Sequence, residues 1–194
     1  MSSNFSSPAT SILWITCIIS IAVSLPLCAA ETGKRFISFE GFTLEDVTLA
    51  EIQKKLGPSK VILTGDASTA DARISYAIKG GTIQFASDEM GGCTTVDEFL
   101  FTTNTTIKPR SPWPRNLPMP RMYLSGLQPG ISKKQFEKVV NCPIQWTGED
   151  GMAIFESKLP MAHSKQYWDV SVTVTGHFQL GRLVEFSISK ITSN

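Results

Sequence analysis

A short helix pattern occurs twice in this 194-residue chain, and it limits the possible folds more than any other feature. Thr48-Leu-Ala-Glu51 is a capping box, in which each of the two side chains accepts a free amide N–H at the start of a helix. The pattern therefore predicts one short helix over residues 48–57. Its apolar face and its stop signal are formed by Leu49, Ile52, Leu56, Gly57 and Pro58.

The second copy of the pattern covers residues 131–143. Ser132-Lys-Lys-Gln135 is again a capping box, and Asn141 is suited to a left-handed cap before Pro143. We therefore expect a second helix of the same length. The corresponding positions, in order and at unbroken spacing, are Thr48 and Ser132, Glu51 and Gln135, Ile52 and Phe136, Leu56 and Val140, Gly57 and Asn141.

Segments that resemble strands follow each helix. The strands predicted after the first helix are residues 61–66, 72–78 and 82–87, with Gly80-Gly81 as a hairpin turn. Those predicted after the second are 152–157, 167–176 and 181–190. In the last two, apolar and polar side chains alternate, which is typical of antiparallel strands with one buried face. The predicted fold class is α+β, with two tandem repeats of a short capped helix and a small antiparallel β-meander.

A proline-rich stretch separates the two units. Five prolines between Pro109 and Pro120 exclude a helix interior or a central strand. We expect a first repeat over 31–103, a connector over 104–122 and a second repeat over 123–194. The connector could alternatively be a ligand for an aromatic groove on another protein.

The first thirty residues are typical of a secretory signal peptide. A polar start precedes the apolar run 12–27, and Cys28-Ala-Ala30 has the small side chains of a cleavage site. Residues 1–30 are therefore predicted to be removed, which implies a periplasmic or secreted protein without a stable membrane span. The segment contains no lysine or arginine, so an uncleaved anchor is one alternative. Lipidation at Cys28 is another.

Removal of the leader leaves two cysteines, Cys93 and Cys142. In an exported chain this even count predicts one disulfide between them, which closes a loop of about fifty residues. The two histidines, His163 and His177, are not spaced from the cysteines as metal ligands. The sequence therefore predicts neither a metal nor a cofactor.

The charge balance and the motifs argue against nucleic-acid binding and against catalysis. Eighteen basic and seventeen acidic residues produce no overall field that would attract nucleic acid. The chain contains no nucleophile elbow, zinc-protease motif or phosphate-binding glycine loop. We therefore expect a protein that is not an enzyme and has no catalytic residues.

The tandem capped helices behind a leader resemble the secreted β-lactamase-inhibitor-protein fold. Each unit is also similar to the SmpA/OmlA module, a small lipoprotein of the bacterial outer-membrane barrel-assembly machinery. The resemblance implies that the strands of both halves join side by side in one curved sheet with the helices on one face. It also implies that partners bind the other face, and that the chain binds proteins or envelope components. The residues that carry the resemblance are Thr48, Glu51, Ile52, Leu56, Gly57 and Pro58, and Ser132, Gln135, Phe136, Val140, Asn141 and Pro143.

The predicted function is that of an exported, non-catalytic protein-binding module whose partner is another envelope or secreted protein. An inhibitor or immunity-type protein that acts on a periplasmic or secreted enzyme is the first hypothesis. An envelope scaffold that resembles the outer-membrane assembly lipoproteins is the second, and binding of a small ligand on the sheet is the third.

Two sets of side chains are candidates for contact with a partner. Aromatic residues serve as anchors at many interfaces, whereas Phe155 and Trp168 share the alternation of buried positions and are expected in the core. The acidic residues would face a basic partner and accelerate its approach. The aromatic candidates are Trp113, Trp146 and Tyr167, and the acidic candidates are Asp66, Asp88, Glu89, Asp97 and Glu98.

Overall fold

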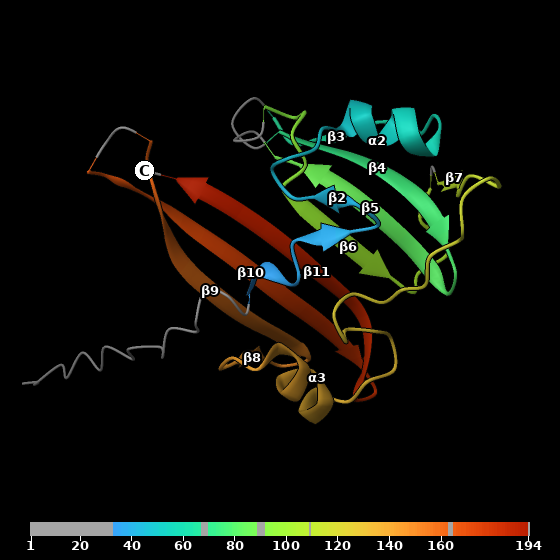
Figure 1. The fold of residues 1–194 in the computed structure, drawn as a ribbon. Helices are drawn as coiled ribbons and strands as arrows, with labels where there is room; N and C mark the ends of the chain where they lie inside the picture. Colours follow the sequence, from blue (N-terminus) through green and yellow to red (C-terminus); the bar gives the residue numbers. More distant parts are fainter. Residues whose placement is uncertain (1–32, 67–69, 89–91, 109, 163–164, 194) are drawn as a thin grey trace, which may run out of the picture.

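The chain folds mainly into one antiparallel sheet (Figure 1). The computed structural model describes residues 33–66, 70–88, 92–108, 110–162 and 165–193. The strands are β1 (Ser38–Phe39), β2 (Phe42–Thr43), β3 (Ile62–Thr64), β4 (Asp71–Ile78), β5 (Gly81–Ser87), β6 (Glu98–Thr102), β7 (Ser111–Pro112), β8 (Gln145–Thr147), β9 (Asp150–Pro160), β10 (Tyr167–Gln179) and β11 (Arg182–Ser193). The nine-stranded sheet has the order β3-β4-β5-β6-β11-β10-β9-β8, and β7 pairs with β4 beside this path.

Both predicted helices are confirmed. Each begins with its capping box: Thr48 accepts the N–H of Glu51, Ser132 accepts the N–H of Gln135, and the longer side chain accepts the cap N–H in return. The second helix ends at Asn141, whose φ of 52° is the predicted left-handed conformation. The helices are α2 (Leu49–Leu56) and α3 (Lys133–Val140).

The apolar core lies on one face of the sheet, here called the inner face. Aromatic side chains dominate it, and the rings of Phe101 and Phe186 stack at 4.6 Å across the pairing of β6 with β11. This pairing joins β3–β6 to β8–β11, so the core is continuous across the molecule.

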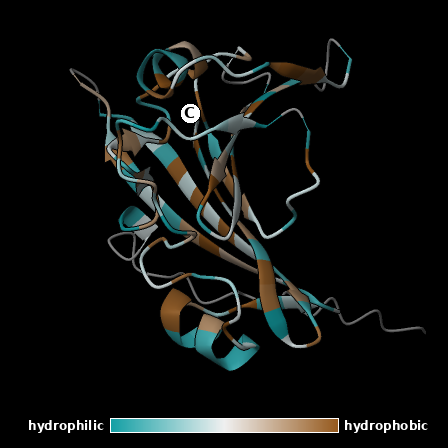
Figure 2. Ribbon diagram, turned by 90° about the vertical axis from the view of Figure 1, so that its right-hand side faces the viewer, coloured by the Kyte–Doolittle hydropathy of each residue, from teal (hydrophilic) through white to brown (hydrophobic). Residues whose placement is uncertain are grey.

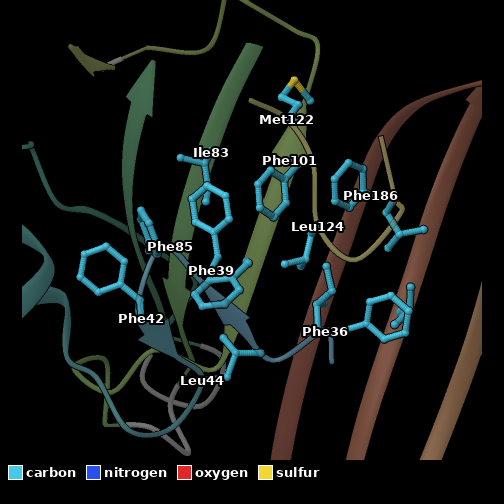
Figure 3. Close-up of a cluster of buried hydrophobic side chains, with 14 of the residues drawn as sticks. Phe36, Phe39, Phe42, Leu44, Ile83, Phe85, Phe101, Met122, Leu124 and Phe186 are labelled. Carbon is cyan, nitrogen blue, oxygen red and sulfur yellow. The ribbon is translucent and has the colours of Figure 1, made fainter. Parts of the chain in front are cut away.

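The segment before α2 covers the inner face. Phe36, Phe39, Phe42 and Leu44 are almost fully buried, and Figure 3 shows them among side chains of β5, β6 and β11. Arg35 attaches the start of this segment to α3, because its guanidinium donates to the carbonyl oxygen of Val139 at the end of that helix. The β1–β2 hairpin is therefore a layer of the core.

A glycine allows α3 to approach the sheet closely. The ring of Phe136 lies 2.8 Å from the position that a Cβ on Gly176 of β10 would occupy. Any other residue at this position would displace α3, which explains a glycine inside a long strand.

The opposite, outer face of the sheet is rich in hydroxyl and amide side chains. Gln84 donates to the Ser75 hydroxyl at 3.1 Å, and Thr175 and Ser187 share a hydroxyl hydrogen bond of 2.9 Å. The alternation of the two faces appears in Figure 2 as teal and brown bands along the strands. The predicted alternation in β10 and β11 therefore corresponds to an apolar inner face and a polar outer face.

The predicted fold class, α+β with two helix-plus-meander repeats, is wrong. The structure is mostly antiparallel sheet, with two eight-residue helices in the part of the chain described. The strands after α2 have 3, 8, 7 and 5 residues, whereas those after α3 have 3, 11, 13 and 12. Capping boxes locate the start of a helix but carry no information about the amount of sheet that follows, and this explains the error.

The proline-rich segment packs against the sheet. Ser111 and Pro112 pair in parallel with Tyr76 and Ala77 of β4, and Trp113 next to them is buried. The segment therefore covers part of the first half of the sheet. The domain boundaries proposed from the sequence remain a prediction, and residues 1–30 lie outside the part described.

Candidate functional site

The three aromatic residues predicted as anchors lie in different environments. Trp113 is only 4% exposed, and its ring meets Tyr76 edge-on at a centroid distance of 6.3 Å. Trp146 is partly buried beside α3, where its Nε1 donates to Glu137 at 3.1 Å. Both tryptophans stabilise the fold, and of the three only Tyr167, which is 56% exposed, is open to a partner.

The predicted acidic residues do not form one surface in the part of the chain described. Asp88 and Asp97 line a pocket, whereas Glu98 is the first residue of β6 and points to the opposite side from its neighbour. Asp66 is exposed after β3, and Glu89 lies outside the described residues.

The pocket lies where the segment before α2, the β5–β6 connection and the end of β11 meet, and we call it the junction pocket. Its volume is about 230 Å³. Glu45 accepts from Lys190 at 2.8 Å and from both the N–H and the hydroxyl of Thr192, at 2.8 and 2.6 Å. This pair of charges therefore attaches the segment before α2 to β11. The lining residues include Glu45, Asp88, Thr95, Asp97, Lys190 and Thr192.

Asp97 is the titratable group of the junction pocket. Burial raises the pKa of Asp97 to about 7, and the nearby carboxylates of Asp88 and Glu98 act in the same direction. The carboxylate accepts the N–H of Asp88 at 2.8 Å, which opposes the rise. The pocket therefore becomes more negative as the pH passes neutrality. Sequence reasoning missed Glu45 and Lys190, because no local signal joins residues so far apart.

The predicted disulfide between Cys93 and Cys142 is absent, because Cys93 carries a free thiol. Cys93 lies in the β5–β6 connection, whereas the Sγ of Cys142 lies 3.6 Å from the carbonyl oxygen of Ile154 in β9. Strands β11 and β10 separate β6 from β9, a distance of about 14 Å across the sheet. A disulfide requires Cα atoms within about 7 Å of each other.

Three strands project beyond the end of β6 and form what we call the arm: residues 156–160, 167–171 and 191–193 (Figure 1). The arm holds four of the exposed large apolar side chains among the described residues. Trp168 is 38% exposed, so its predicted place in the core is wrong, whereas buried Phe155 confirms the prediction for that residue. The difference arises because the arm extends past the inner-face core. The four apolar side chains are Leu159, Tyr167, Trp168 and Ile191.

A groove with a volume of about 580 Å³ lies on the arm. Lys158 and Asp169 form an exposed ion pair of 3.6 Å in its wall. Glu156 takes part in none of the ion pairs between described residues, so the groove carries a net negative charge. The alternation of apolar and polar side chains assigned Trp168 to the core, and it could have been applied to Ile191 as well. It could not show where the core ends. The groove is lined by Glu156, Lys158, Asp169, Ser171, Ile191 and Ser193, among others.

The described part of the chain bears on two further possibilities, a metal site and a membrane-spanning helix. It holds no group of three or more histidine, cysteine, aspartate or glutamate side chains placed to bind a metal ion. None of its helices has the length and apolar character needed to cross a membrane.

Comparison with known proteins gives a weak structural likeness. No family model matches the chain, and no curated protein matches it. The chain is similar to a crystal structure from Streptococcus mutans described as a "putative beta-lactamase inhibitor protein". The identity is 11% and the TM-score 0.26, over 76% of this chain and 83% of that chain. A likeness of this size does not establish a shared fold.

Proposed function

We propose that this protein is an exported, non-catalytic protein-binding module that holds its partner on the arm. The observation that supports the proposal is the concentration of exposed Leu159, Tyr167, Trp168 and Ile191 on one projecting part of the sheet. Tyrosine and tryptophan are the side chains that most often dominate binding energy, because they bury a large area at a small cost in conformational entropy. Tyr167 and Ile191 point to the outer face with the groove, whereas Leu159 and Trp168 point to the inner face, so the arm exposes apolar side chains to a partner on both faces.

The chemistry of the groove favours one class of partner. The lining includes apolar Ile191, and it holds the carboxylates of Glu156 and Asp169 against a single lysine, Lys158. A protein segment with an apolar side chain between basic residues complements both features. Because such charges accelerate the encounter, association should slow markedly as salt rises.

The first hypothesis for the biological role is an inhibitor or immunity-type protein that acts on a secreted or periplasmic enzyme. An envelope scaffold is the alternative, and lipidation distinguishes the two. Palmitate labelling that disappears with Cys28→Ser would favour the scaffold. A released, unlabelled protein that begins near Glu31 would favour the inhibitor.

The test uses the secreted form of the full chain as bait for envelope and culture proteins, followed by binding measurements with each purified candidate. We expect Tyr167→Ala and Trp168→Ala each to weaken binding about tenfold or more. Leu180→Ala is the matched control, since Leu180 is 97% exposed at the turn between β10 and β11, far from the arm. A partner bound equally well by the wild-type protein and the arm variants would contradict the proposal. Failure to bind any protein, together with activity on a cell-wall substrate, would do the same.

A further inference from the structure

Among the described residues, the outer edge of β9 is paired over only a short part of its length. β9 has eleven residues, and β8 pairs only with Asp150, Gly151 and Met152. No strand among the described residues pairs with that edge over residues 153–160. Unpaired edges of this length are templates for another strand, and proteins normally protect them.

The backbone groups that face outward can be assigned. The carbonyl oxygen of Ile154 points away from β10, since it lies 3.6 Å from Cys142, which precedes β8 on that side. Backbone direction alternates along a strand, so the N–H and C=O groups of Glu156 and Lys158 also point outward. Ile154 and Pro160 share this direction, but the carbonyl oxygen of Ile154 faces Cys142 and Pro160 has no N–H. Glu156 and Lys158 therefore remain as the hydrogen-bonding positions that the edge offers.

The edge is complementary to itself. When two copies of β9 run antiparallel about Ser157, Glu156 of each copy lies opposite Lys158 of the other, and Phe155 lies opposite Leu159. A shift of two residues in either direction places glutamate opposite glutamate or lysine opposite lysine. Like charges directly opposite each other are destabilising, so one register is selected. Asp169, 3.6 Å from Lys158 on the neighbouring strand, extends the alternating row of charges.

We propose that two copies of this chain associate through the outer edges of β9 and form one continuous sheet. The interface is two-fold symmetric, because the same residues act on both sides. Each Glu156–Lys158 pair exchanges two backbone hydrogen bonds and one side-chain ion pair. The inference does not rest on the proposed function, because it needs no other partner.

A charge-exchange experiment tests the proposal. Sedimentation equilibrium of the secreted protein should give a dimer. Glu156→Lys and Lys158→Glu should each raise the dimer dissociation constant about tenfold or more, because like charges then face each other twice. The double variant Glu156→Lys/Lys158→Glu should restore the wild-type dissociation constant to within about threefold, since it restores both opposite-charge pairs.

The controls separate the edge from general charge and folding effects. Lys54→Glu, on the exposed side of α2, makes the same change of charge elsewhere and should leave the dimer unchanged. Circular dichroism of each variant verifies the sheet. A wild-type protein that is monomeric at 100 µM would overturn the inference, as would a double variant that dissociates as readily as the singles.

Discussion

At the scale of single residues, Asp97 couples folding to pH. Its pKa of about 7 in the folded protein lies above the ordinary value of 3.8, so the folded state binds the proton more tightly than the unfolded chain. The stabilisation is complete below about pH 4 and is lost as the pH rises through 7. Asp97→Asn imitates the protonated form and still accepts the Asp88 N–H. In the Asp97→Asn variant, the free energy of unfolding should therefore fall less between pH 4 and 8 than in the wild-type protein. The expected difference is about 1–2 kcal/mol, since partial exposure screens the effect.

Urea titrations at pH 4, 5, 6, 7 and 8 measure this effect. Asp46→Asn is the control, because Asp46 is exposed beside Glu45 and lies outside the lining of the junction pocket. If the wild-type and Asp97→Asn curves remain parallel over the whole range, Asp97 is not the group responsible.

Trp113 shows the limit of residue-level prediction. Prolines on both sides of it indicate an extended segment, and this is correct, but they do not show what that segment touches. Its burial depends on Tyr76 of β4, which is far away in the sequence. Tyr167 shows the reverse case, since its exposure results from the arm's projection beyond the core.

At the scale of elements, the caps determine where the helices begin. Ser132→Ala removes the acceptor for the N–H of Gln135 at the start of α3. We expect a loss of about 1 kcal/mol in the free energy of unfolding, measured by urea titration. Ser132→Thr keeps a hydroxyl at the same position and should retain most of the stability. An equal loss in both variants would show that packing at Ser132, and not the cap, is what matters.

The helices and long strands could be predicted because their signals are local. The capping boxes located α2 and α3, and alternation located β10 and β11. Gly80-Gly81 indicated the β4–β5 hairpin, but its turn is Lys79-Gly80, since Gly81 already pairs with Ile78. β1, β2 and β7 could not be predicted, because two-residue strands have no periodicity. Their pairing depends on tertiary contacts of residues such as Phe39 and Phe42.

At the scale of the whole molecule, Glu45 joins the segment before α2 to the sheet. Glu45→Ala leaves the mostly buried side chain of Lys190 without its partner and removes the acceptor for Thr192. We expect a loss of about 2–3 kcal/mol in the free energy of unfolding, because an unpaired buried charge is costly. Hydrogen exchange should show faster opening at the Thr192 amide. If that amide exchanges at the wild-type rate, Glu45 does not hold the end of β11.

The order of the strands in the whole sheet was not accessible from local sequence patterns, although the resemblance implied that both halves join in one sheet. Local patterns describe each strand, but the order of strands depends on which apolar faces meet, as in the stacking of Phe101 on Phe186. The candidate site on the arm could not be predicted from the sequence for the same reason. The arm exists because β9, β10 and β11 are longer than β6, and only the register shows this.

Both ends of the described chain lie close to the arm, and this affects how the protein can be labelled. Gly33 lies against Phe155 of β9, and Ser193 pairs with Asp169 of β10. A fluorescent protein or affinity tag attached directly at Gly33 or Ser193 would crowd the surfaces proposed for binding. The Leu180–Gly181 turn, about 40 Å away along β10, is the better place for a dye or an inserted epitope.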